Sequence, residues 1–181
     1  AQYEGLTCTF LEFAASGGGG ILSDNADGEK IIFNSSQNRK ALHYMHDLIH
    51  RYKISPPNTF TEMKEEEVRM FFQQGNALFE RNWPYAWALH QSPNSQVKDK
   101  VGIAPLPHFS EGESVSTLGG WHIGISKYSD LTLLPCTFIS FVTSYINQKK
   151  LALKLGWNPA RTDVYQDKEL IEKMPHLAYL R

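Results

Sequence analysis

The fold is decided by residues 77–89, which read ALFERNWPYAWAL. The first part of this stretch, residues 77–81, starts with three consecutive non-polar residues and predicts a strand. Pro84 fits the first turn of a helix, because its missing N–H would have no helical partner there in any case. A strand that leads directly into a helix is the building unit of an α/β fold.

Two amphipathic helices are predicted before this stretch. The first runs from the capping residues 34–36 to about Tyr52, and the proline pair 56–57 disfavours its continuation. Its apolar side chains follow one face of a 3.6-residue period: Ala41, Leu42, Met45, Leu48, Ile49 and Tyr52. The second helix follows Thr61, carries glutamates in its first turns, where the helix dipole favours negative charge, and ends at Gly75.

Strand patterns alternate with these helices. Residues 3–13 predict a strand running into a short helix that the glycines 17–20 end. Further strands are predicted at residues 31–33, 101–107 and 117–125. Because strands alternate with helices along the chain, the sequence predicts the α/β class.

Helices dominate the prediction for the last third of the chain. One spans about Leu133 to Tyr145, with Pro135 in its first turn, and another spans Gln148 to Leu155. The segment 156–159, Gly-Trp-Asn-Pro, interrupts the chain, and two short helices are predicted after it.

Composition excludes several classes of protein. The 181 residues carry 18 Lys and Arg against 19 Asp and Glu, a formal net charge of −1, so the broad basic field of a non-specific nucleic-acid binder is missing. No run of roughly 18 apolar residues occurs, and no segment predicts a membrane-spanning helix. Cys8 and Cys136 form no CxxC pair, which leaves one disulfide and two buried thiols equally open.

Candidate metal-binding and catalytic residues are few. His46 and His50 stand four residues apart, a spacing that can place two imidazoles on one metal, but without a third ligand a solvated helix face is the simpler interpretation. His108 and His122 flank a loop with acidic residues, where ordinary loop composition explains them as well as a general-base role does. Neither a GxSxG motif nor a phosphate-binding loop occurs. The sequence therefore predicts no catalytic residue, no metal and no cofactor.

Aromatic residues at element ends are the strongest functional signal. They stand next to Pro or Gly, where side chains often face clefts: Trp83, Tyr85, Trp87, Trp121 and Trp157. A sugar offers an apolar C–H face and a rim of hydroxyls, so its site needs flat aromatic surfaces and planar hydrogen-bonding groups. Arg161 supplies such a planar group, because its rigid fork can donate to two adjacent hydroxyls. Burial of any of these tryptophans in a core stays open.

Several motifs in a fixed order carry a family resemblance. They are FQQG at 72–75, RNWPYAWAL at 81–89, VGIAPLP at 101–107, TLGGW at 117–121, TSY at 143–145 and GWNPAR at 156–161. With them the chain resembles the extracellular solute-binding proteins of sugar ABC transporters, and is most similar to the trehalose/maltose-binding branch. The likeness runs from Tyr3 to Leu177.

The resemblance implies a lobe of the type II periplasmic-binding-protein fold, with a central sheet flanked by helices. Full members have two lobes that close on a sugar and are roughly twice as long, so residues 1–181 are expected to be the C-terminal lobe. Residues 1 to about 100 and about 130 to 181 would build this lobe. Residues 101–129 would cross the hinge toward the N-terminal lobe.

The resemblance also places the ligand contacts. Carried over residue by residue, they fall on Trp83, Tyr85, Gly120, Trp121 and Arg161. The two tryptophans would be stacking platforms, and Tyr85 a platform with a hydroxyl. Gly120 would offer a backbone contact, and Arg161 would clamp sugar hydroxyls.

Other positions are packing residues or departures from the family pattern. Trp87 and Trp157 are interpreted as packing residues. Pro135 with Cys136 replaces an alanine-rich helix start, which puts the start of that helix in doubt. Residues 158–160, Asn-Pro-Ala, replace the usual Leu-Pro-Thr beside the arginine, a change that could alter sugar preference.

The function implied is a non-enzymatic receptor that delivers its ligand to the membrane permease of an ABC transporter. The ligand is a mono- or oligosaccharide, expected to be an α-linked disaccharide such as maltose or trehalose. An extracytoplasmic location, in the periplasm or as a cell-surface lipoprotein, follows from the same resemblance. Neither a nucleic-acid partner nor direct membrane insertion of this segment is expected.

Two other functions compete with this one. A fragment of a carbohydrate-active enzyme, such as a glycosidase, would need two carboxylates about 5 to 10 Å apart in the aromatic cleft, and only Glu80 accompanies the motifs. A protein-interaction domain would instead show the aromatics as an exposed patch.

Overall fold

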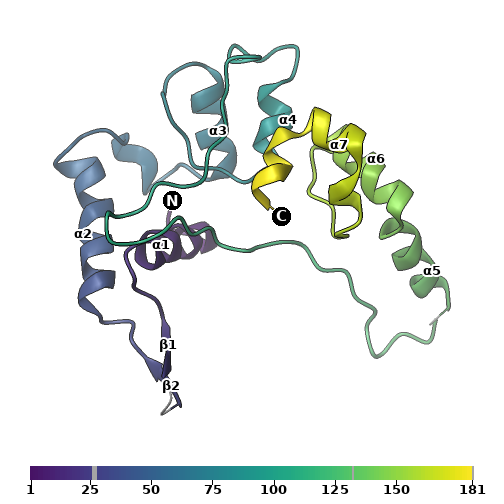
Figure 1. Ribbon diagram of the computed structural model, residues 1–181, viewed down its shortest axis with the longest axis horizontal. Coiled ribbons are helices and arrows are strands. Elements are labelled where there is room, and N and C mark those ends of the chain that lie inside the picture. Colours follow the sequence, from purple (N-terminus) through teal and green to yellow (C-terminus); the bar gives the residue numbers. More distant parts are fainter. Residues whose placement is uncertain (26–27, 132, 181) are drawn as a thin grey trace. The chain divides into compact units, whose positions relative to one another are not determined.

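Helices dominate the structure, a computed structural model that describes residues 1–25, 28–131 and 133–180 (Figure 1). The chain divides into two compact units, and each is described by itself. The first unit holds residues 1–71, 79–81 and 104–118. The second holds residues 72–78 and 82–103 and the chain from Gly119 onward.

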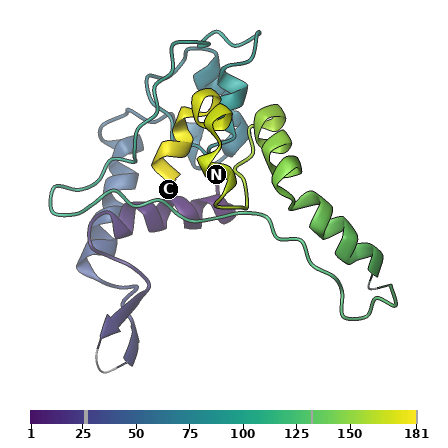
Figure 2. The same cartoon turned by 45° about the vertical axis from the view of Figure 1, so that its right-hand side comes forward.

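The first unit is built on two helices that pack against each other, α1 (Glu4–Ala15) and α2 (Ser36–His50). Ala14 of α1 and Ala41 of α2 are completely buried, and such small side chains let two helices approach closely. The other elements are β1 (Leu22–Asn25), β2 (Gly28–Ile31), the short 3-10 turn η1 (Pro57–Thr59) and the start of α3 (Glu65–Gln73). Figure 2 shows the β1–β2 hairpin projecting from the end at which α2 begins.

The second unit consists of short helices. They are α4 (Ala86–His90), α5 (Leu133–Val142), α6 (Tyr145–Leu155), η2 (Val164–Gln166), α7 (Lys168–Lys173) and η3 (Pro175–Leu180). Its core joins apolar side chains of α6, η2, α7 and the segment after α7: Ala152, Val164, Leu170, Met174 and Leu177. The Lys149 ammonium adds ion pairs of 2.9 Å to Asp167 and to Glu169, which tie α6 to α7.

The predicted helices with clear capping signals are confirmed. Ser35 caps α2, because its hydroxyl accepts the Asn38 N–H at 3.2 Å. In α3 the Glu67 carboxylate accepts the Lys64 N–H at 3.0 Å, so the glutamates of the first turn close the helix start. Gly75 follows α3 with φ +78°, the left-handed conformation expected after a helix end. The helices predicted around Pro84 and from Leu133 to Leu155 correspond to α4, α5 and α6.

The strand predicted at residues 3–13 is wrong, because this segment is the helix α1. The Thr9 hydroxyl donates to the Gly5 carbonyl one turn earlier at 2.9 Å, and Gly5 and Glu12, two turns apart, are both buried. A helix satisfies its backbone hydrogen bonds internally, whereas a strand would need a neighbouring strand. The predicted glycine stop is confirmed: Gly18 has φ +76°, and the Gly19 N–H closes the helix onto the Ala14 carbonyl.

The central sheet that the resemblance implies is not confirmed. In the described part of the chain the sheet is the antiparallel pair of β1 and β2, in which Leu22 lies opposite Ile31. Of the strand predicted at residues 31–33, only the first residue belongs to β2. Residues 77–81, 101–107 and 117–125 have no strand assignment, so these predictions are wrong. Their apolar residues suit a strand, but a strand forms only where a second strand pairs with its backbone.

No helix in the described part of the chain is both long enough and apolar enough to cross a bilayer.

Candidate functional site

Trp83, Pro84 and Tyr85 form a tight turn that leads into α4. The Asn82 side-chain oxygen accepts the Trp83 N–H at 2.8 Å, and the Trp83 carbonyl accepts the Ala86 N–H at 3.0 Å. Pro84 fits this turn because its ring fixes φ near the value that a turn of helix requires. Trp83 and Tyr85 both remain partly exposed on this turn.

A glycine brings the TLGGW motif against Trp83. A Cβ atom added to Gly119 would lie 3.3 Å from the Trp83 indole, so the bare backbone of this residue packs on the ring. For Gly120, the described residues place no heavy atom within 4 Å of such a Cβ, so the backbone there is open. The next residue, Trp121, is completely exposed. In this motif Gly119 thus packs on the Trp83 ring, and the Trp121 indole lies in solvent.

A second glycine positions the GWNPAR motif. Gly156 ends α6 with φ +70°, a backbone conformation that L side chains rarely adopt. A Cβ atom there would collide with the Ala88 side chain and lie 3.6 Å from the Tyr85 carbonyl oxygen. The motif that ends in Arg161 therefore starts against the turn that carries Tyr85.

Gln148 fixes the same motif from the other side. Its side-chain oxygen accepts the Ala160 N–H at 2.7 Å, and its amide nitrogen donates to the Val142 carbonyl at 2.9 Å. Gln148 is buried, and both ends of its amide are hydrogen-bonded. The backbone next to Arg161 is therefore held to the junction between α5 and α6.

Asp163 holds the side chain of Arg161. The Arg161 Nε donates to one carboxylate oxygen at 3.0 Å and Nη2 donates to the other at 2.7 Å. This fork lowers the pKa of the Asp163 carboxyl, and the carboxylate in turn raises the pKa of the Arg161 guanidinium. The remaining guanidinium N–H groups are available to donate to a ligand.

The lowered pKa of Asp163 bears on the glycosidase alternative. A glycosidase needs a carboxyl group that stays protonated as a general acid, together with a second carboxylate. Asp163 lies beside Arg161, and the bidentate contact favours its charged form. The surroundings of Asp163 thus keep its carboxyl ionised, whereas a general acid must stay protonated.

The five residues predicted as ligand contacts all belong to the second unit. Glycine packing brings the motifs of Trp83, Trp121 and Arg161 together through the turn at residues 83–88. Their roles as ligand contacts stay a prediction.

Trp87 and Trp157 differ in their surroundings. Trp87 is partly buried, its ring centroid lies 6.4 Å from that of His176, and it lines a hollow of about 460 Å³ together with Met174 and Pro175. This agrees with the packing role predicted for it. Trp157 exposes 56 % of its surface, so its predicted packing role is wrong for this chain.

Three side chains that hold these segments in place were not predicted from the sequence. Asp163 could have been noticed as an acid two residues after Arg161, whereas Gln148 stands between the polar residues Asn147 and Lys149 and has no such signal. Glu12 had no local signal, because its partner Arg81 is distant in the sequence. Both oxygens of the buried Glu12 carboxylate accept from Arg81, at 2.7 and 2.6 Å, within the first unit.

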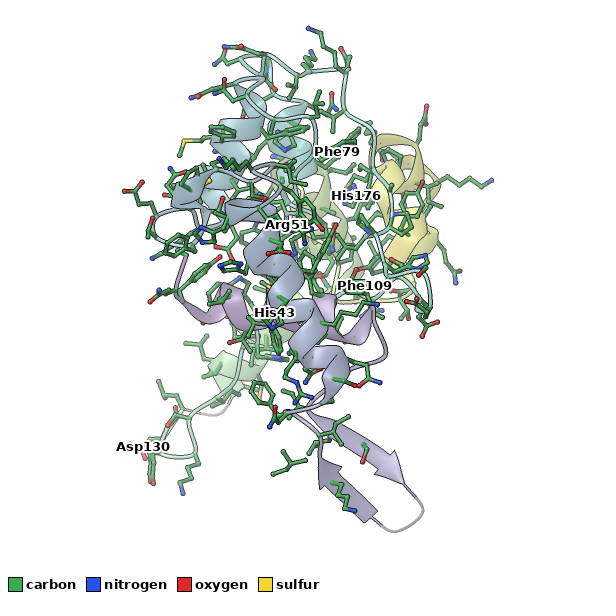
Figure 3. The ribbon with its side chains drawn as sticks, turned by 90° about the vertical axis from the view of Figure 1, so that its left-hand side faces the viewer. His43, Arg51, Phe79, Phe109, Asp130 and His176 are labelled. Atoms are coloured by element: carbon green, nitrogen blue, oxygen red, sulfur yellow. The ribbon has the colours of Figure 1, made fainter. Side chains whose placement is uncertain are left out.

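His46 and His50 lie on α2, on which Figure 3 labels His43. The rings of His46 and His50 are in contact, with centroids 4.4 Å apart and a tilt of 32°, and the Asp47 carboxylate lies 3.3 Å from the His46 Nδ1. Among the described residues, no group of three or more His, Cys, Asp or Glu side chains could hold a metal ion.

The architecture and the motifs define a class of protein. The chain belongs to the family described as bacterial extracellular solute-binding proteins, whose model matches residues 2–149. The resemblance expected from the motifs is thereby confirmed.

Individual relatives agree with this assignment. A probable ABC transporter-binding protein of Deinococcus radiodurans is 35% identical over 99% of this chain and 41% of its own length. The arabinooligosaccharide-binding protein of Bacillus subtilis is 32% identical over 97% of this chain and 40% of its own length. The solved structure of maltose-bound T. maritima MalE3 is 43% identical with a TM-score of 0.89, covering 98% of this chain and 45% of that one. The chain thus spans about two fifths of the length of the curated relatives it matches.

Proposed function

We propose that this chain is part of a sugar receptor that serves an ABC transporter. It contributes to the non-enzymatic, extracytoplasmic binding of an α-linked disaccharide of the maltose or trehalose type, which the receptor delivers to a membrane permease. The single observation that carries the proposal is the meeting of three motifs: Gly119 packs on Trp83, and Gly156 packs on the turn that holds Tyr85.

The chemistry of the five residues suits a sugar. Trp83 and Trp121 offer flat faces for the C–H side of a pyranose ring, and Tyr85 adds a face with a hydroxyl. The open backbone at Gly120 can exchange hydrogen bonds with hydroxyls. Arg161 donates from the N–H groups that Asp163 leaves unused, and its orientation is set before a ligand arrives.

The proposed ligand class is consistent with two relatives. One solved relative is described as maltose-bound, and one curated relative is named for an arabinooligosaccharide. Both names refer to short saccharides. The choice of an α-linked disaccharide rests on the higher identity to the maltose-bound protein, 43% against 32%.

The lobe assignment is part of the same proposal. Residues 101–129 cross a hinge, and residues 1–100 and 130–181 form the C-terminal lobe of a two-lobed receptor. In support, residues 101–131 contain no helix or strand, and most of their side chains are exposed. Residues 104–118 of this segment belong to the first unit, where the Thr117 N–H donates to Glu12 and the Phe109 ring contacts Tyr44. A segment without a helix or strand that is held by another part of the chain suits a connection between lobes.

The test is a titration followed by NMR of the tryptophan indole N–H groups. Maltose, trehalose, sucrose and glucose are each added to tens of millimolar, because one part of a closing site binds weakly, with Kd on the order of 1 mM. We expect selective shifts of the Trp83 and Trp121 indoles that disappear in Arg161→Ala.

The matched control is Arg51→Ala, which removes an exposed, carboxylate-paired arginine of the first unit and should leave the shifts intact. A well-dispersed spectrum that no sugar changes contradicts sugar binding by this chain. Shifts that survive in Arg161→Ala contradict the role given to the arginine.

A further inference from the structure

The exposed side of α2 carries a stripe of basic side chains. They follow one another at intervals of four, three and four residues, so they share one face of the helix: Arg39, His43, His46 and His50. All four are exposed, and Figure 3 labels His43 among them. These four residues are called the basic stripe below.

Further cations lie next to the basic stripe at both ends of the helix. Lys40 follows Arg39 in the first turns, and Arg51 and Lys53 follow directly after the last turn; all of them are exposed. Residues 36–53 carry four Lys and Arg against one Asp, whereas the whole chain has a formal net charge of −1. Positive charge is therefore concentrated on this helix, and the rest of the chain is net negative.

Asp47 and Glu111 neutralise this surface only in part. The Asp47 carboxylate lies 3.3 Å from the His46 Nδ1 and 3.5 Å from the Arg51 guanidinium. The Glu111 carboxylate, in the same unit, lies 3.5 Å from the Lys40 ammonium. Such long, exposed ion pairs contribute little free energy, so a stronger anionic partner can replace them.

The form of this surface suits a flat anionic partner. From Arg39 to His50 the helix rises by about 16 Å, so the charges form a line along it. Just beyond the helix, Tyr52 and Ile54 expose 49 and 72 % of their surface, and the Phe60 ring lies 6.3 Å from that of His50. Aromatic and apolar side chains beside basic ones are typical of protein surfaces that rest at the headgroup level of a bilayer. They favour a lipid surface over an acidic protein as the partner.

We propose that the basic stripe, together with Lys40, Arg51 and Lys53, binds the anionic phosphate headgroups of a membrane surface. Guanidinium and ammonium groups donate charge-assisted hydrogen bonds to phosphate oxygens, and imidazole N–H groups add further donors. A few basic residues give a weak and reversible attachment, in which the chain adsorbs without inserting a helix. For the receptor proposed above, adsorption would confine the search for a permease to the membrane plane. The attachment itself depends on the charge of α2 and not on the sugar site.

The experiment is sedimentation of the chain with phospholipid vesicles. Vesicles that contain phosphatidylglycerol and phosphatidylcholine are compared with vesicles of phosphatidylcholine alone. Both are tested at about 10 mM salt, where charges act over about 30 Å, and at about 1 M salt, where they act over about 3 Å. We expect the chain to bind the anionic vesicles at least about tenfold more tightly than the neutral ones in low salt, and to be released in high salt.

Charge-reversal variants locate the contact on the molecule. The double variant R39E/K53E reverses a charge at each end of α2 and should weaken binding to the anionic vesicles at least about tenfold. The matched control K150E/K154E reverses two exposed lysines of α6 and changes the net charge equally, so it should alter binding less than about twofold. Circular dichroism checks that each variant folds. Lys53→Glu alone lies outside the helix and serves as a second test, with an expected loss of at least about threefold.

Four results would overturn the proposal. The first is equal binding to neutral and anionic vesicles. The second is unchanged binding of R39E/K53E and of Lys53→Glu. The third is an equal loss in K150E/K154E, which would show a general effect of net charge. The fourth is retention of the chain on immobilised poly-glutamate without any binding to anionic vesicles, which would make an acidic protein the partner of α2.

Discussion

Removal of Arg81 is expected to destabilise the first unit strongly. The Arg81 guanidinium meets both oxygens of Glu12, whose side chain exposes only 6 % of its surface. In Arg81→Met the buried carboxylate loses its charge partner, and such a loss generally costs about 3–5 kcal/mol. Arg81 itself is 25 % exposed, so water can reach part of the vacated site, and the Thr117 N–H still donates to Glu12 at 3.0 Å. We therefore expect a loss of about 2–3 kcal/mol in the free energy of unfolding.

The assay is equilibrium urea unfolding followed by circular dichroism, applied to a double-mutant cycle. Glu12→Gln keeps an acceptor for Thr117 and removes the charge, so Arg81→Met should cost much less in that background. The control is Arg51→Met, because its pair with Asp47 is 3.5 Å long and exposed, and should cost less than about 0.5 kcal/mol. The reasoning is refuted if Arg81→Met lowers the free energy of unfolding by no more than Arg51→Met does. It is also refuted if the effects of Arg81→Met and Glu12→Gln are additive in the double mutant.

Three further outcomes follow from single residues. Burial without a hydrogen-bond partner lowers the pKa of His176 to about 4. As the pH falls below 6.5 the unfolded chain is therefore protonated at this residue before the folded chain is, and the free energy of unfolding should fall by up to about 1.4 kcal/mol per pH unit between pH 6.5 and 4. His176→Phe should remove this pH dependence in urea unfolding. In thermal melts, Gly156→Ala should lower the free energy of unfolding by at least about 1 kcal/mol more than Gly75→Ala does. Both glycines have a positive φ, but only at Gly156 would an added side chain collide with a neighbouring one. Asp163→Asn should weaken maltose binding about three- to tenfold in the NMR titration, because it loosens the contact that orients the Arg161 guanidinium. Glu66→Gln loosens a comparable contact to Arg69 in the first unit and should leave maltose binding unchanged.

Helices with local signals could be predicted from the sequence. Ser35 caps α2 as the pattern around residues 34–36 indicated, and the glutamates of α3 lie in its first turn. These signals act within one turn of the chain, so they need no knowledge of distant residues. Gly75 and Gly156 end their helices for the same local reason.

The strands could not be predicted, because strand pairing is a long-range property. Residues 101–107 and 117–125 contain apolar residues that suit a strand, but a strand needs a partner backbone, and the sequence pattern does not supply one. The error at residues 3–13 has a related cause. Apolar, β-branched and aromatic residues suit a strand and a buried helix alike, and the helical spacing of Gly5 and Glu12 becomes evident only once their burial is known.

The candidate site shows a similar division between local and distant information. Its residue types could be listed from the sequence, because aromatic rings and an arginine fork are what a sugar requires. What brings them together is the bare backbone of Gly119 on the Trp83 ring and of Gly156 beside Tyr85, contacts that span 36 and 71 positions of the chain. The hydrogen bond from Ala160 to Gln148 and the fork of Asp163 then fix the arginine. The glycines thus have a structural reason at these positions that composition alone does not reveal: a side chain on Gly156 would collide with Ala88, and one on Gly119 would press on the Trp83 ring.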